Sequence, residues 1–326
     1  MAHVECGAIL QDVRPAHLGG AGDPALETPE GRATMKQKII AGETDQQKRH
    51  ECTGSVVNVP GIPPSYDYEW FPSTAAVPTD LLSVLEMTCQ IYLREADGVV
   101  CVSAKAFEEE VITLVNEWFS ELKKPWYNVG PLSIDSPKDN SCRAELQEET
   151  PVVSFLNRIQ SEFGPNSLLY MSLGSVFWPE EQDRVWAVLD GFIAKRQPFL
   201  NIAPFSHFSN FQTEMKKKIA DSGNSDGVTG WFLTHGGWNS VQEAFQYRVP
   251  LIFWPFAADQ PYNAMRLSYL KAGFALLEVR TGQEWNEEAL QLRETPSIHV
   301  SLSSSRNRAI SGQTQRRRKF DGQNKL

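Results

Sequence analysis

The chain has 326 residues, of which 41% are hydrophobic and 22% are charged. This composition is typical of a globular protein, and the length is sufficient for two domains. The formal net charge of −9 at neutral pH disfavours nucleic acid as a partner.

Residues 1–50 lack sustained hydrophobic periodicity and are rich in Gly, Ala, Pro and charged residues, so we expect them to be poorly ordered or unassigned to a domain. They show no basic start followed by a long apolar run, and no stretch reaches the roughly 18 apolar residues that span a membrane. The five cysteines are scattered without a Cys-x-x-Cys pair, which favours reduced thiols. We therefore expect a cytoplasmic protein without a membrane span.

Residues 51–135 contain alternating helix and strand patterns. Short apolar runs at Gly98–Val102 and Tyr127–Val129 predict two strands, and a helical pattern lies between them, which predicts a βαβ unit. An earlier helix is predicted to begin at Thr79 or Asp80. The predicted apolar face of the earlier helix comprises Leu81, Leu82, Leu85, Cys89 and Tyr92, and that of the later helix comprises Val111, Leu114, Val115, Trp118 and Leu122. The aromatic cluster Tyr66, Tyr68, Trp70 and Phe71 favours packing over the lining of a ligand pocket.

The polar residues 136–150 are predicted to link this part to a second domain, residues 151–285. That domain begins with a helix over 152–163, a strand over 168–173 and a turn at Gly174 and Ser175. A helix opened by Pro179 follows, with Val185, Leu189 and Ile193 on its apolar face, and then a strand over 199–203. Further along the chain we expect a helix over 264–275, a strand over 274–279 and a disordered tail over 286–326. The basic run 316–319 favours a solvated tail over a nucleic-acid patch.

The stretch 230–263 carries the strongest functional signal. It predicts a strand at 231–233, a glycine turn at 234–237 and a helix whose apolar face contains Val241, Ala244 and Phe245. Gly236 and Gly237 allow close approach of a ligand, and Asn239 and Ser240 are residue types that cap helices. A helix N-terminus in this setting attracts phosphate.

Two groups of polar residues extend this candidate site. Glu243 lies on the same helix face as Asn239 and Ser240, and its carboxylate can accept hydrogen bonds from vicinal sugar hydroxyls. The apolar run 249–256 predicts a buried parallel strand, and Asp259 and Gln260 follow where it ends. Since ligands bind at the carboxyl ends of such strands, His235, Glu243, Asp259 and Gln260 are predicted to face one nucleotide sugar.

This stretch resembles the signature of family 1 UDP-dependent glycosyltransferases, which include plant secondary-product enzymes and related fungal ones. The resemblance implies that His235 and the Asn239–Ser240 pair contact the diphosphate, that Glu243 binds the ribose and that Asp259 and Gln260 bind the transferred sugar. A matching Gly-Ser pair implies that Ser175 also contacts the diphosphate. The predicted nucleotide-sugar set is Ser175, His235, Gly237, Trp238, Asn239, Ser240, Glu243, Asp259 and Gln260, although Trp238 considered alone is more typical of packing.

Two parts of the family pattern are not found. The family's Trp-Ala-Pro-Gln sequence, which contacts uracil, is replaced by residues 217–220. The family's catalytic base is a His that follows an N-terminal strand, and neither His3, His17 nor His50 has that context. The catalytic residue is therefore unassigned, and no metal or cofactor is implied beyond the UDP-sugar donor.

The resemblance implies an α/β fold, a GT-B-like pair of Rossmann-type domains of which the N-terminal one is incomplete. It implies inverting transfer of a hexose, most simply glucose, from a UDP-sugar to a hydroxyl of a small lipophilic acceptor in secondary metabolism. The alternative is a catalytically inactive remnant that at most binds nucleotide sugar. A Rossmann oxidoreductase is disfavoured because no Gly-x-Gly-x-x-Gly followed by an acidic residue occurs.

Overall fold

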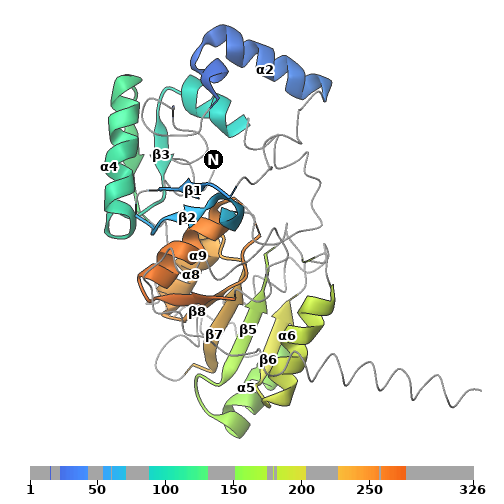
Figure 1. Cartoon of the computed structure of the whole chain (residues 1–326). Helices are drawn as coiled ribbons and strands as arrows, with labels where there is room; N and C mark the ends of the chain where they lie inside the picture. The colour runs from blue at the N-terminus through green and yellow to red at the C-terminus, as the bar shows by residue number, and fades with distance from the viewer. Residues whose placement is uncertain are drawn as a thin grey trace, which may run out of the picture. The chain divides into compact units, whose positions relative to one another are not determined.

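The computed structural model describes residues 15, 23–42, 54–59, 61–70, 88–130, 151–174, 179, 182–202, 227–256 and 258–276. The chain divides into two units, Met1–Arg293 and Glu294–Leu326, and every described residue belongs to the first. The predictions for Ser175, residues 217–220, the linker and the C-terminal tail lie outside the described residues. Figure 1 labels the helices and strands used below.

The first described elements are the 3₁₀ helix η2 (Pro24–Glu27) and the helix α2 (Pro29–Ala41). The helix α2 was not predicted, because it buries none of its residues and therefore has no apolar face to detect. Its ends carry the local signals: Thr28 Oγ1 accepts the Gly31 N–H at 3.1 Å, and Gly42 ends the helix in the left-handed region.

A short hairpin and a helical turn come next. The strands β1 (Val56–Val57) and β2 (Ser65–Tyr66) pair antiparallel, and the 3₁₀ helix η3 (Asp67–Trp70) follows. Trp70 is buried, which agrees with the packing role expected for the aromatic cluster. Residues 88–95 are helical as predicted, but Tyr92 is 67% exposed and does not lie on the buried face.

The predicted βαβ unit is confirmed. The parallel strands β3 (Val99–Cys101) and β4 (Trp126–Asn128) are connected by α4 (Lys105–Glu121), whose predicted face buries Val111, Val115 and Trp118. One residue near the start of α4, Glu108, has non-helical dihedrals of φ −134° and ψ 43°.

The second part of the chain forms a parallel sheet of five strands with the order β6-β5-β7-β8-β9. Its strands are β5 (Leu168–Ser172), β6 (Phe199–Ile202), β7 (Thr229–Thr234), β8 (Leu251–Phe253) and β9 (Gly273–Ala275), and its helices are α5 (Pro151–Phe163), α6 (Gln182–Ala194), α8 (Trp238–Tyr247) and α9 (Asp259–Tyr269). The chain adds β6 on one side of β5 and then β7 on the other. The direction of strand addition therefore reverses between β5 and β7, and such a switch point is where open α/β sheets bind ligands.

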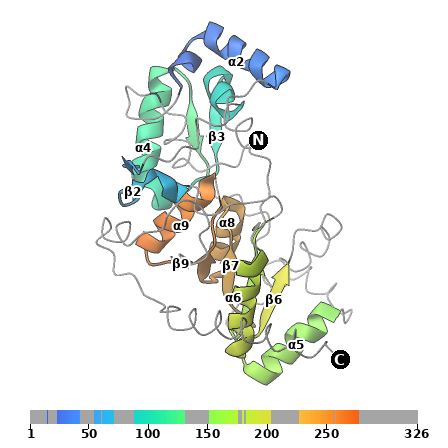
Figure 2. The same cartoon turned by 45° about the vertical axis from the view of Figure 1, so that its right-hand side comes forward.

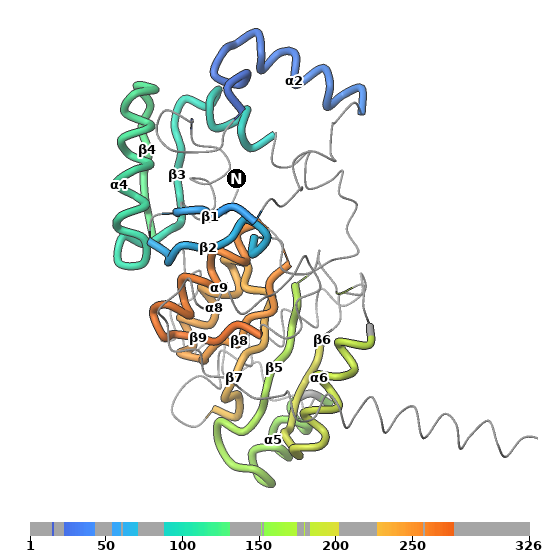
Figure 3. Tube along the Cα trace, viewed as in Figure 1, coloured from blue at the N-terminus to red at the C-terminus, as the bar shows by residue number. Residues whose placement is uncertain are grey.

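Helices cover both faces of this sheet, as Figure 3 shows. Val185 and Leu189 of α6 pack on one face, and Val241 and Ala244 of α8 pack on the other. The predicted α/β class with a parallel sheet is confirmed. Two predicted core positions are wrong, because Ile193 is 63% exposed and Phe245 is 43% exposed.

The helix α9 begins at Asp259, five residues before the predicted start at residue 264. Asp259 and Gln260 therefore lie in the first helical turn, and not in a loop after β8. Figures 1 and 2 both place α9 beside β2, and α9 also contacts η3. Among the described residues, no helix is both long enough and apolar enough to cross a membrane.

Candidate functional site

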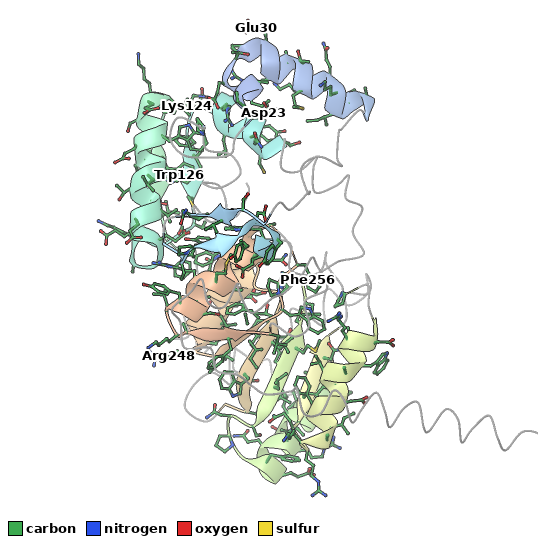
Figure 4. All side chains as sticks on the ribbon, viewed as in Figure 1. Asp23, Glu30, Lys124, Trp126, Arg248 and Phe256 are labelled. Atoms are coloured by element: carbon green, nitrogen blue, oxygen red, sulfur yellow. The ribbon has the colours of Figure 1, made fainter. Side chains whose placement is uncertain are left out.

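The candidate site lies where β5 and β7 end. Ser172 pairs in register with Thr234, and Thr234 pairs with Phe253 of β8, so these three strands reach the same edge of the sheet. The turns that follow β5 and β7 therefore lie next to each other at the switch point. Figure 4 labels Phe256 near this edge and Arg248 at the other end of α8.

The imidazole of His235 lies between these two turns. A Cβ atom built on Gly174 would come within 2.7 Å of His235 Nε2, and one built on Gly237 would also come within 2.7 Å of it. Such distances are shorter than any normal contact, so a Cβ atom at either place would displace the ring. Gly174 in addition has a φ of +83°, which favours glycine. The structure thus brings together the turn after β5, the turn after β7 and the His235 ring.

Thr234 holds the turn that carries His235. Its side chain is fully buried, and its Oγ1 accepts the Gly236 N–H at 3.2 Å. The same oxygen lies 3.3 Å from His235 Nδ1. This contact directs Nε2 toward the glycines. Thr234 was not predicted as a site residue.

The helix α8 begins directly after the glycine turn. Its N-cap is Gly237, so the prediction that Asn239 or Ser240 caps the helix is wrong. Asn239 is exposed and Ser240 is half-buried, and both lie in the first turn. Their position keeps them at the helix end that attracts anions.

Asp259 approaches the same helix end from α9. Its Oδ2 accepts the Trp238 N–H at 2.9 Å, which satisfies one of the N–H groups that a helix leaves unpaired at its start. Burial raises the pKa of Asp259 from 3.8 to about 6, although the hydrogen bond from the Trp238 amide acts in the opposite direction. The carboxyl group is therefore both close to the site and costly to ionise.

Gln260 and Asn263 hold the surrounding backbone. Gln260 is 3% exposed, and its Oε1 accepts the Phe256 N–H at 3.0 Å. Asn263 is fully buried, and its Nδ2 donates to Gly236 O at 2.8 Å and lies 3.4 Å from Asp259 Oδ2. Asn263 was not predicted as a site residue, and its position four residues after Asp259 is informative only once α9 is known to begin at Asp259.

Glu243 lies in the second turn of α8. It is half-buried, and its negative charge contributes to the raised pKa of Tyr170, about 12, whose main cause is burial of the phenol. A hydrogen bond with Ser172 acts in the opposite direction and offsets part of this rise in the pKa of Tyr170. Glu243 is thus close enough to Tyr170 of β5 for its charge to act on the phenol.

Trp238 takes a packing position. Its side chain is 3% exposed, and its ring is stacked on Phe107 with the centroids 5.2 Å apart. The group that Trp238 presents to the site is its backbone N–H, which Asp259 accepts. Within the described residues, no three His, Cys, Asp or Glu side chains gather as a metal site.

Comparison with known proteins adds evidence on the family of the chain. A model of the UDP-glucoronosyl and UDP-glucosyl transferase family matches residues 223–291, which include His235 and Asp259. The chain is 28% identical over 280 residues to UDP-glycosyltransferase eriJ of Hericium erinaceus, covering 80% of this chain and 55% of that protein. It is 27% identical over 272 residues to flavonol 3-O-glucosyltransferase UGT76E12 of Arabidopsis thaliana, covering 72% and 57%.

A solved structure with a similar chain trace is a UDP-glucosyltransferase from Polygonum tinctorium, described as capable of glucosylating indoxyl and bound to 3,4-dichloroaniline. It has a TM-score of 0.49 and 23% identity, covering 75% of this chain and 55% of that one. The chain spans about half the length of the curated relatives it matches. The family match over the candidate site and the similarity of the longer alignments show that the chain is related to the family 1 UDP-dependent glycosyltransferases.

Proposed function

We propose that this chain binds a UDP-sugar at the edge of the sheet between β5 and β7, as part of a glycosyltransferase. The observation that carries the proposal is the His235 ring, which lies across Gly174 and Gly237 beside the start of α8. A diphosphate needs hydrogen-bond donors and positive potential without a bulky side chain in the way. The glycines, the imidazole and the helix N-terminus supply these features together.

The proposed reaction is transfer of a hexose, most simply glucose, with inversion at the anomeric carbon. An acceptor hydroxyl oxygen forms a bond to that carbon while the bond from the carbon to the diphosphate oxygen breaks. The hydroxyl proton passes to a general base, and the negative charge goes to the leaving UDP. His235 is the one histidine within the described residues, and its place beside α8 suits stabilisation of the leaving group.

The carboxylates fit the hydroxyl groups of the donor. Glu243, placed near β5, suits the vicinal hydroxyls of the ribose. Asp259 suits the transferred sugar, since with a pKa of about 6 it is largely ionised at neutral pH and accepts hydrogen bonds from hydroxyl groups. Gln260 follows Asp259 in α9, and its Oε1 accepts the Phe256 N–H.

The relatives support the finer parts of the proposal. The Arabidopsis relative is named for glucosyl transfer to a flavonol, which supports glucose as the sugar and a small, largely apolar acceptor. The comparisons give no support to the alternative of an inactive remnant.

Two experiments test the proposal. Titration calorimetry of the full chain with UDP-glucose should give a saturable heat, and the variant His235→Ala should bind more weakly. Incubation with UDP-[¹⁴C]glucose and a panel of phenols, sterols and hydroxy fatty acids should give a labelled product. Absence of binding would refute the site, and binding without transfer to any acceptor would refute the catalytic part.

A further inference from the structure

The helix α9 belongs to two packed regions at once. Its first turn carries Asp259 into the candidate site. One turn further on, Tyr262 and Met265 pack in a cluster with Trp70 and Val111 from the first part of the chain. Movement of α9 would therefore affect the site and this cluster together.

Arg266 makes the polar contacts of α9 with the first part of the chain. Its Nη2 and Nε donate to Phe107 O at 2.7 and 3.2 Å, and its Nη1 donates to Gly61 O. The guanidinium carbon lies 5.8 Å from the centroid of the Phe107 ring, within cation–π range. One half-buried side chain thus joins two segments that are distant in the sequence.

The backbone of α4 is arranged for this contact. Glu108 interrupts the helical dihedrals directly after Phe107, and its buried carboxylate accepts the Ser103 hydroxyl. A carbonyl at such a break needs a partner outside the regular helix pattern. The two N–H groups of Arg266 provide that partner.

Phe107 in turn contacts the candidate site. Its ring stacks on Trp238 with the centroids 5.2 Å apart and meets Phe245 edge-on at 6.1 Å. The Trp238 N–H is bonded to Asp259, which lies on the same helix as Arg266 and seven residues before it. Arg266, Phe107, Trp238 and Asp259 are therefore connected in a closed circuit of contacts, because the first and the last belong to the same helix.

We propose that Arg266 is a positioning residue, which holds Phe107 against Trp238 and so keeps the first turn of α8 and Asp259 in the geometry of the site. Arg266 does not touch the reacting atoms and acts through Phe107. The effect of Arg266 on the position of Trp238 and Asp259 does not depend on a ligand. Only its effect on UDP-glucose affinity rests on the proposed function.

The test compares Arg266→Gln with Arg248→Asn in the full chain. Arg248 is exposed at the end of α8 with a φ of +56°, which Asn tolerates, so the control removes the same charge with little strain. Hydrogen exchange would be followed at the Trp238 amide and, as an internal reference, at the Met171 amide in the centre of the sheet. We expect Arg266→Gln to accelerate exchange at Trp238 on the order of tenfold relative to Met171, and the control to leave the ratio unchanged.

A second variant tests the route of the effect. If Arg266 acts through Phe107, the double variant Arg266→Gln/Phe107→Leu should exchange the Trp238 amide at nearly the same rate as Phe107→Leu alone. If the two residues act independently, the accelerations caused by the two substitutions should multiply. UDP-glucose affinity should fall several-fold in Arg266→Gln. Equal acceleration at Trp238 and Met171 would show a general loss of stability and overturn the proposal, as would an unchanged ratio. If Trp238 responds but the wild-type protein does not bind UDP-glucose, the positioning role stands and the proposed function fails.

Discussion

The ionisation of Asp259 makes a pH-dependent prediction about stability. Its pKa is raised from 3.8 to about 6 by burial, a difference of about 2.2 pH units. Because the folded protein binds this proton more tightly than the unfolded chain, the group stabilises the fold at low pH. This contribution begins to fall as the pH passes 3.8 and is lost once the pH has risen through about 6.

The size of the effect follows from the same shift. At about 1.36 kcal/mol for each pH unit, the loss is about 3 kcal/mol. We take this value as an upper bound, because the side chain of Asp259 is partly accessible to solvent and screening reduces the effect. The variant Asp259→Asn resembles the protonated acid, keeps an oxygen for the Trp238 N–H and does not titrate.

The assay is urea denaturation of the wild-type protein and Asp259→Asn between pH 5 and 8. All other titrating groups cancel in the difference between the two free energies of unfolding. Asp259→Asn should be the more stable protein at pH 8, and its advantage should grow by up to about 1.4 kcal/mol from pH 5 to pH 8. A difference that does not change with pH, or a wild-type protein that is more stable at pH 8, would refute the buried placement of this carboxyl group.

Three further predictions concern the same site. His235→Ala should weaken UDP-glucose binding by about 1 to 3 kcal/mol in calorimetry, the cost of a lost charge-assisted hydrogen bond, and an unchanged affinity would contradict the assigned role. Gly174→Ala should lower both stability and affinity, because a Cβ there meets His235 Nε2 at 2.7 Å, whereas the control Gly191→Ala in α6 meets nothing within 4 Å and should be neutral or stabilising. Thr234→Val leaves the buried Gly236 N–H without its acceptor and should lower the free energy of unfolding by about 1 to 3 kcal/mol; a neutral result in denaturation would show that the turn holds without this bond.

The sequence predicted the regular elements of the sheet well, for a physical reason. Strands such as β5 are buried on both faces and have nearly continuous apolar sequences, and α4 buries the apolar face that its spacing predicts. The glycine turn and the residues after β8 were located because their types and spacing are characteristic.

The errors have identifiable causes. The start of α9 was missed because Asp259 and Gln260 are polar and were read as a loop. The exposed positions of Phe245 and Ile193 show that helical spacing does not determine how far around a helix the packing extends. The contacts of Phe107 with Trp238 and of Gly174 with His235 join distant parts of the chain, and no local pattern in the sequence encodes them.

In the proposed site, the His235 ring and the first turn of α8 hold the diphosphate of a UDP-sugar. A crystal structure of the full chain with UDP-glucose would locate that diphosphate. We expect a diphosphate oxygen within about 3.2 Å of His235 Nε2, with another facing the amides of Asn239 and Ser240. A diphosphate bound elsewhere on the protein, with the His235 ring still lying between Gly174 and Gly237, would rule out the proposed site.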